Sequence, residues 1–342
     1  MAQRKVRFIE PASRPGRPFN GWIRSWPLLG PILLATQLRK RGYDAAVYNE
    51  NISGRLEDNP EGMADVADAD VVGLSIMTAT ANRGYELAGL LRDCAPQAVI
   101  AIGGPHASFV PEEAARYGDV VVRGEGENII EAIAAGDIRE GVHSPEPPQD
   151  LDALPAPDHE VVRDFNRLMR TRGGRATYEL PMMTSRGCPH GCVYCSVTQM
   201  FGRKVRRQSV GKVLSDLRYG RERGFRRIFF YDDNLTTDRA WFRELLEGIK
   251  PMGLRWNGQV RIDMHWEDRS RRKPDEALLE AMHDSGADVL YVGYETIDEE
   301  TARTWKKGYR GSDSLVSRLL EDTTILHSRG AWIHGIFLIG PQ

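Results

Sequence analysis

The first 140 residues alternate short, almost continuously apolar runs with longer amphipathic stretches. The apolar runs are rich in β-branched residues and end in Gly, Ser, Asn or Glu; they lie at 5–11, 44–50, 70–76, 98–104 and 119–127. Apolar residues recur at helical spacing between them, near 28–41, 80–94 and 127–135. Buried parallel strands need crossover helices, so this pattern predicts an α/β domain with a doubly wound, Rossmann-type parallel sheet. Such sheets bind ligands over the carboxyl ends of their strands.

A second series of alternating strands and helices follows a Pro-rich stretch. Its predicted strands lie at 177–185, 226–234, 254–263, 288–296 and 331–340, and its predicted helices lie near 209–223, 238–249, 275–285 and 312–329. Five such steps predict a partial (β/α), TIM-like barrel with its chemistry at the carboxyl ends of the strands.

The two series and the stretch between them divide the chain into three parts. We predict a first domain over 1–140, a linker over 141–175 and a partial barrel over 176–342. The Pro-rich segment 144–160 continues neither a sheet nor a helix, which suits a linker. The sequence stops just after the fifth predicted strand, which would leave an exposed sheet edge, so we expect that it is part of a longer chain.

Composition narrows the class of protein. The chain has 342 residues, 41% hydrophobic and 27% charged, which is ordinary for a globular protein of two domains. A net charge of -2 gives no long-range attraction to nucleic acid or anionic lipid. The apolar run 27–35 is far shorter than the roughly 20 residues that span a bilayer, and the N-terminus lacks the apolar core of a signal peptide. We expect a cytoplasmic protein without a membrane span or a nucleic-acid partner.

The cysteines carry the strongest chemical signal. Three of the four, Cys188, Cys192 and Cys195, form a C-x3-C-x2-C motif directly after the first strand of the second series. Thiolates are soft ligands that suit zinc, copper(I) or iron–sulfur clusters. Three cysteines on a four-iron cubane leave one iron without a protein ligand. The motif therefore predicts an iron–sulfur cluster with one iron open to a small molecule.

A zinc site is the alternative. It would use the three cysteines and His190, although one short segment would have difficulty folding four donors round one ion, and the usual paired-knuckle spacing is absent. Such a protein would bind nucleic acid through the basic run 202–209. The simpler interpretation of that run is a solvated loop that leads into a helix capped by Ser209; contact with an anionic substrate is the other.

With Tyr194 before the last cysteine, the motif resembles that of the radical S-adenosylmethionine (SAM) superfamily. The resemblance implies a [4Fe–4S] cluster whose open iron binds the amino and carboxylate groups of SAM. An electron from the cluster then cleaves SAM to a 5′-deoxyadenosyl radical. It also implies a small-molecule substrate and an electron donor such as flavodoxin or ferredoxin.

The resemblance also assigns SAM contacts to residues near the strand ends. Asp232 and Asp233 fall where the family's second-strand motif meets the methionine amino group, and Arg261 could pair with the carboxylate of SAM. Glu295 falls at the ribose or methionyl contact. Gly335 and Gly340 would let the backbone approach adenine, and Tyr194 is the remaining candidate.

The first domain resembles the cobalamin-binding domain often fused in front of this superfamily. Small residues after the third and fourth strands, and a turn within 122–127, match its landmarks and leave room for a corrin ring. The candidate cobalamin contacts are Ser75, Gly103, Gly104, Gly124, Glu125 and Gly126.

One landmark of the cobalamin-binding domain is missing. Gly30 fits the family's D-x-H-x-x-G motif, but Ser25 and Pro27 replace its aspartate and histidine, so this loop offers no lower histidine ligand to cobalt. The alternative is a domain that supports the barrel or binds another ligand. A nicotinamide is disfavoured, because no G-x-G-x-x-G follows the first strand.

Both resemblances together imply a radical SAM enzyme that is cobalamin-dependent. We expect methyl transfer to an unactivated carbon. The alternative within the family is oxidative cyclisation or rearrangement of a tetrapyrrole, lipid or natural-product precursor.

Overall fold

The computed structural model describes residues 3–14, 16–17, 20–21, 25–171, 178–267, 273–308 and 313–340. The chain forms two compact units, Met1–Tyr178 and Glu179–Gln342, and each is described by itself. Within the described ranges, no helix is both long enough and apolar enough to cross a membrane.

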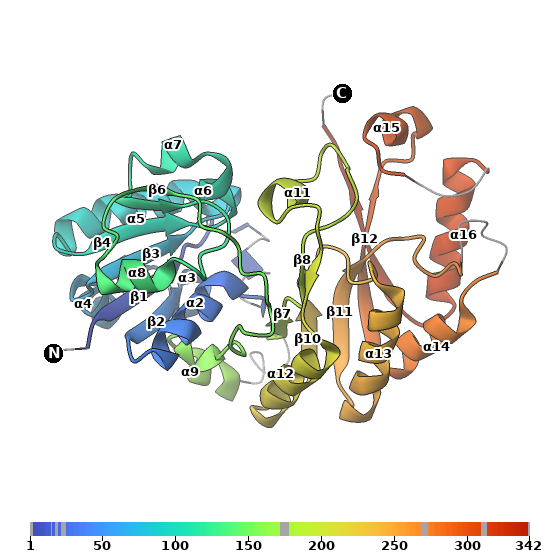
Figure 1. Ribbon diagram of the computed structural model, residues 1–342, viewed down its shortest axis with the longest axis horizontal. Helices are drawn as coiled ribbons and strands as arrows, with labels where there is room; N and C mark the ends of the chain where they lie inside the picture. The colour runs from blue at the N-terminus through green and yellow to red at the C-terminus, as the bar shows by residue number, and fades with distance from the viewer. Residues whose placement is uncertain are drawn as a thin grey trace. The chain divides into compact units, whose positions relative to one another are not determined.

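The first unit is built on a parallel sheet of six strands in the order β2-β1-β3-β4-β5-β6 (Figure 1). The strands are β1 (Lys5–Glu10), β2 (Asp44–Asn49), β3 (Val71–Ser75), β4 (Val99–Gly103), β5 (Val120–Val122) and β6 (Gly141–His143). The predicted doubly wound sheet and its five strands are confirmed. The sixth strand was missed because it is a short edge strand without an apolar run, in which Val142 is 48% exposed.

Helices cover both faces of this sheet. They are α2 (Leu29–Lys40), α3 (Glu50–Ser53), α4 (Pro60–Ala67), α5 (Ala81–Cys94), α6 (Pro105–Phe109), α7 (Pro111–Ala114), α8 (Ile130–Ala135) and α9 (Phe165–Arg170). On α5 the buried residues Ala81, Tyr85 and Ala88 recur at helical spacing and pack on one face of the sheet. Helix α2 contacts β1, β2 and α8 and contributes nothing to that cluster, so it lies on the other face.

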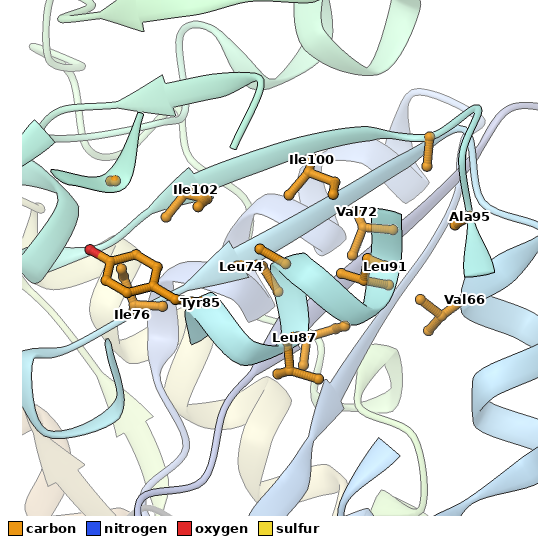
Figure 2. Close-up of a cluster of buried hydrophobic side chains, with 14 of the residues drawn as sticks. Val66, Val72, Leu74, Ile76, Tyr85, Leu87, Leu91, Ala95, Ile100 and Ile102 are labelled. Carbon is orange, nitrogen blue, oxygen red and sulfur yellow. The ribbon is translucent and has the colours of Figure 1, made fainter. Parts of the chain in front are cut away.

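Figure 2 shows the core between α5 and the sheet. Alternate residues of the central strands, among them Val72, Leu74 and Ile100, point into it and are at most 1% exposed. Near-continuous apolar strands are explained by this arrangement, because the intervening residues face the helices on the opposite side.

Residues beyond 140 remain part of the first unit. Strand β6 pairs with β5, Val162 forms a bridge to Val47, and the Arg163 amide donates to the Val47 carbonyl at 2.8 Å. The predicted linker begins at 141; within it, residues 141–143 and 162–163 contact the first sheet.

The second unit holds a parallel five-stranded sheet in the order β13-β12-β11-β10-β7. Its strands are β7 (Leu180–Met182), β10 (Arg227–Phe230), β11 (Arg255–Val260), β12 (Ala287–Glu295) and β13 (Trp332–Phe337). Consecutive strands are neighbours in the sheet, so the predicted partial barrel is confirmed.

Helices α12 (Val210–Glu222), α13 (Arg239–Ile249), α14 (Glu276–Asp284) and α16 (Leu315–His327) form a layer on the second sheet, in which α14 contacts β12 and α16 contacts β13. Two further helices are short: α11 (Val197–Met200), which has no buried residue, and α15 (Glu299–Thr304), which follows β12. Every second residue of β12 is buried, from Asp288 to Tyr294, and the others line the inner face, where the Tyr291 ring lies 4.9 Å from that of His334. The predicted cap is present, since the Ser209 hydroxyl accepts from the Lys212 amide.

Truncation of matched valines tests the core of the first sheet. Val72→Ala removes two fully buried methyl groups and should lower the free energy of unfolding by about 2 kcal/mol. Val142→Ala, the same change on the exposed edge strand, should stay within about 0.5 kcal/mol of wild type. Native-state hydrogen exchange of the β3 peptide measures both without interference from the second unit. Equal effects of the two changes would contradict this description of the core.

Candidate active site

A short antiparallel ribbon closes the cysteine loop at its base. Strand β8 (Ser185–Arg186) pairs with β9 (Arg206–Arg207), so residues 187–205 form one closed loop. Gly187 has φ +97°, and a Cβ there would lie 2.6 Å from the Lys204 carbonyl oxygen. The loop entrance therefore requires glycine. The basic run 202–209 contains β9, so it is not wholly the solvated loop that the simpler interpretation described.

Three of the loop's thiols lie within electrostatic reach of one another. Burial raises the pKa of Cys188 and that of Cys195, and the neighbouring thiols contribute to both shifts. Within the described ranges, no three Cys, His, Asp or Glu side chains are grouped as ligands of a single metal ion. Three thiols on one loop are the ligand number of a four-iron cluster with one open iron, whereas a structural zinc site takes four donors.

The two candidate aspartates after β10 have different surroundings. Asp232 is fully buried and accepts from the Thr184 amide at 3.0 Å, the Thr184 hydroxyl at 2.7 Å and the Ser185 hydroxyl. Burial raises its pKa. Asp232 thus ties the end of β10 to the segment that enters the cysteine loop.

Asp233 lies within electrostatic reach of the cysteines, because its charge contributes to the pKa shifts of Cys188 and Cys195. Burial and the adjacent Asp232 raise the pKa of Asp233 to about 7. Of the two candidates, Asp233 is the carboxyl brought to the thiols.

Glu295 ends β12 in a left-handed conformation, with φ +63°. Its carboxylate oxygen Oε1 lies 3.3 Å from the Lys307 ammonium. A Cβ on Gly293 would lie 2.3 Å from Oε1, so glycine at that position makes room for the carboxylate. Glu295 also contributes to the pKa shift of Cys195. The structure therefore brings Glu295, like Asp233, near the cysteine loop.

Arg261 is directed to protein groups. Its guanidinium donates to both carboxylate oxygens of Asp263, at 3.0 and 3.2 Å, and to the carbonyl oxygens of Lys307 and Gly308. This arrangement positions the 307–308 segment. The predicted pairing with the SAM carboxylate stays a prediction and would require exchange of these bonds.

The remaining barrel candidates lie on the loop and on β13. The Tyr194 ring makes an edge contact with Trp305 at 5.4 Å. A Cβ on Gly335 would lie 3.1 Å from the Tyr294 ring, so packing alone accounts for glycine there. Gly340 is exposed. The adenine contacts assigned to both glycines remain predictions.

In the first unit, the ends of β3 and β4 are made largely of main chain. Gly104 has φ +93°, and a Cβ there would lie 2.7 Å from the Ile76 carbonyl oxygen and 3.2 Å from the Ser75 hydroxyl. A Cβ on Gly103 would meet nothing closer than 3.9 Å. The end of β4 therefore carries no bulky side chain, and a methyl group at Gly103 would make only ordinary contacts.

Ser108 links the predicted turn to this strand end. Its hydroxyl donates to the Gly104 carbonyl and accepts from the Gly124 amide, both at 2.9 Å. Glu125, the next residue, is 7% exposed, and a Cβ on Gly126 would meet the Leu34 side chain at 3.4 Å. Sequence reasoning missed Ser108, because its position carries no motif.

Glu10 is a second residue that the sequence did not reveal. It ends β1, is 1% exposed, and accepts from the Leu28 amide at 3.1 Å. Burial raises the pKa of Glu10 to about 8. A neutral carboxyl therefore holds the loop in which Ser25 and Pro27 replace the missing cobalamin landmark.

Comparison with known proteins matches each unit to a domain family. The model of the B12 binding domain matches residues 25–134, and the model of the radical SAM superfamily matches residues 182–317. Bacteriochlorophyllide d C-12(1)-methyltransferase of Chlorobaculum tepidum is 24% identical over 99% of this chain and 70% of its own length.

Solved structures share the fold. The cobalamin-dependent SAM radical enzyme OxsB, with aqua-cobalamin bound, superposes with a TM-score of 0.75 at 18% identity, over 98% of this chain. The radical SAM methyltransferase TsrM of Kitasatospora setae gives a TM-score of 0.69 at 16% identity, over 99% of this chain. The chain spans about half of the OxsB chain, 49%, and 70% of the TsrM chain.

Fold and site together define an α/β protein with a cobalamin-type domain in front of a partial radical SAM barrel. The chain carries a B12-binding domain over residues 25–134 and a radical SAM domain over residues 182–317, as the sequence predicted. The predicted cofactors, a [4Fe–4S] cluster, SAM and cobalamin, are those of these two domain families.

Protonation of Glu10 should make the first unit pH-dependent. Its pKa is about 8 in the folded chain and about 4.5 in the unfolded chain, so between these values the folded state binds more protons. The contribution of Glu10 to the free energy of unfolding should fall as pH rises through this window, by up to about 1.4 kcal/mol per pH unit. Glu10→Gln should remove that slope. Hydrogen exchange of the β1 peptide at pH 5, 6.5 and 8 measures it, and identical slopes in both proteins would contradict the assignment.

Proposed function

We propose that this chain carries out cobalamin-dependent radical SAM methyl transfer to an unactivated carbon. The observation that carries the proposal is the closed loop of three thiols beside Asp233 and Glu295 at the strand ends of the second unit. Named relatives support methylation, among them hopanoid C-3 methylase of Methylococcus capsulatus, 29% identical over 82% of this chain.

In this proposal, Cys188, Cys192 and Cys195 hold the cluster. When bound, the cluster supplies the electron that cleaves SAM. The chain's own groups restrain the reactants: Asp233 offers a carboxyl beside the thiols, and Glu295 offers a second one at the end of β12. Asp232 acts indirectly on the cysteine loop, because the hydrogen bonds that it accepts from Thr184 and Ser185 fix the segment that leads into the loop.

Cobalamin would lie over the strand ends of the first unit. When bound, it carries the methyl group between SAM and substrate. Ser75, Gly103 and Gly104 supply a surface without bulky side chains, and Ser108 fixes the turn at 124–126 beside it. With Ser25 and Pro27 in place of the landmark residues, the 25–30 loop supplies no histidine to the metal.

Oxidative cyclisation is the second candidate. The chain is 25% identical, over 92% of its length, to anaerobic magnesium-protoporphyrin IX monomethyl ester cyclase of Cereibacter sphaeroides. The two reactions differ in the fate of the SAM methyl group, which only methyl transfer places in the product. SAM labelled in that methyl group distinguishes them.

The cellular setting belongs to the proposal as well. An open-iron cluster is oxygen-sensitive and needs a one-electron reductant, so we infer an electron donor such as flavodoxin or ferredoxin, a small-molecule substrate and a cytoplasmic location.

Replacement of one loop cysteine tests the cluster. Wild type reconstituted without oxygen should hold about four iron and four sulfide per chain and should cleave SAM when reduced. Cys192→Ala should abolish this cleavage, because a cluster held by two thiolates is lost. Cys94→Ala, which changes the cysteine of α5, should behave as wild type. Iron and sulfide analysis and the yield of 5′-deoxyadenosine are the measurements. A lone zinc ion without sulfide in oxygen-free wild type would overturn the proposal.

A bulky residue at Gly103 tests the cobalamin site. A Cβ at Gly103 would make only ordinary contacts, 3.9 Å from Val122, so the Gly103→Val chain should fold. Its cobalamin affinity should fall about tenfold or more, because the added methyl groups occupy the strand-end surface. Gly103→Ala, with one methyl group, serves as the milder control. Visible spectra of cobalamin bound after gel filtration measure the affinity. If a folded Gly103→Val chain binds cobalamin as tightly as wild type, cobalamin does not bind at this strand-end surface.

A further inference from the structure

Residues 305–308, here named the clasp, connect elements that are distant in the sequence. The Trp305 carbonyl accepts from the Val193 amide of the cysteine loop at 3.1 Å. The Lys307 and Gly308 carbonyls accept from Arg261 after β11. The clasp therefore joins the cysteine loop to the end of β11.

Local chain geometry explains why the clasp lies there. The Lys306 amide donates to the Arg303 carbonyl and the Lys307 amide to the Ala302 carbonyl, both at 3.0 Å. With Lys306 left-handed at φ +54°, these bonds form the Schellman motif that ends α15. The motif turns the chain back, so that Lys307 points to the end of β12 while Lys306 is exposed.

The Lys307 ammonium contacts two candidate site residues. It lies 3.3 Å from the Glu295 carboxylate, and both side chains are only 11% exposed. It also lies 5.9 Å from the centre of the Tyr194 ring, at cation–π distance. A pair so little exposed is stabilising only while both partners are present, because removal of one leaves a buried charge unpaired.

We propose that Lys307 is a positioning residue, which holds the Glu295 carboxylate and the Tyr194 end of the cysteine loop in the arrangement that receives SAM. The inference rests on the proposed function. Lys307 acts through Glu295 and through the clasp rather than by contact with SAM. The left-handed backbone of Glu295 and the space above Gly293 permit this carboxylate orientation, and the ammonium selects it.

Two neighbouring lysines provide a matched test. Lys307→Met should weaken SAM binding to the reconstituted full chain by about 10- to 100-fold. This is the usual effect of removing a residue that orients a ligand-contacting side chain without touching the ligand itself. Lys306→Met removes the exposed neighbouring charge and should leave binding unchanged. Lys307→Arg, which keeps the charge, should restore most of the affinity. Equilibrium dialysis with labelled SAM measures all three.

Two further readouts separate positioning from loss of fold. The change that SAM causes in the electron paramagnetic resonance spectrum of the reduced cluster should be altered by Lys307→Met at saturating SAM, with iron content unchanged. In a double-mutant cycle, Lys307→Met should weaken binding little further once Glu295→Gln is present, because both changes break one interaction. If Lys307→Met unfolds the chain, the proposal is tested instead by SAM binding to Lys307→Arg and by a double-mutant cycle that combines Lys307→Gln with Glu295→Gln.

The outcomes distinguish the two proposals. Wild type that assembles no cluster would overturn the proposed function. Wild type that binds SAM, with Lys307→Met equal to Lys306→Met or with fully additive effects of Lys307 and Glu295, would overturn the role of Lys307 alone.

Discussion

The pairing of β8 with β9 is the interaction on which the candidate active site depends. Two strands of two residues each close a loop that would otherwise carry its cysteines on a long, unrestrained segment. Ordering such a segment has a large entropic cost, and closing its base restricts the conformations from which the thiols must be gathered. Gly187 permits the closure, because only a residue without Cβ can pass the Lys204 carbonyl. The clasp then holds the far end of the same loop.

Both units fix a site-forming segment with a buried carboxyl at a strand end. Asp232 accepts from Thr184 and Ser185 after β10, and Glu10 accepts from Leu28 after β1. Burial raises the pKa in both cases. In each unit a carboxyl that accepts hydrogen bonds from a neighbouring segment orders that segment, while burial makes ionisation of the carboxyl less favourable.

The regular fold was predictable because burial leaves a direct trace in the sequence. Both faces of the first sheet are covered, so its central strands are continuous apolar runs, and α5 shows its buried face by spacing. Strand β6 leaves no such trace, since Val142 is half exposed. The Pro-rich stretch indicated a break between domains. The bridge between Val162 and Val47 joins residues that are far apart in the sequence, so no local pattern could indicate it.

The site was predictable only where the chemistry is local. The cysteine spacing is local, as are the paired glycines after β4. The different surroundings of Asp232 and Asp233 are not, because these depend on Thr184, 48 residues away. Arg261 was assigned by its place at a strand end, but Asp263 and the clasp carbonyls compete for its guanidinium. Lys307 was missed, because nothing in a run of two lysines tells which one the end of α15 turns inward.

The strand ends of the first unit present main chain and small side chains at Ser75, Gly103 and Gly104. A surface of this kind offers few charges for recognition, so it selects ligands by their outline. Its selectivity therefore depends on the exact course of the backbone more than on the identity of any one side chain. Such a surface can persist while much of the surrounding sequence changes.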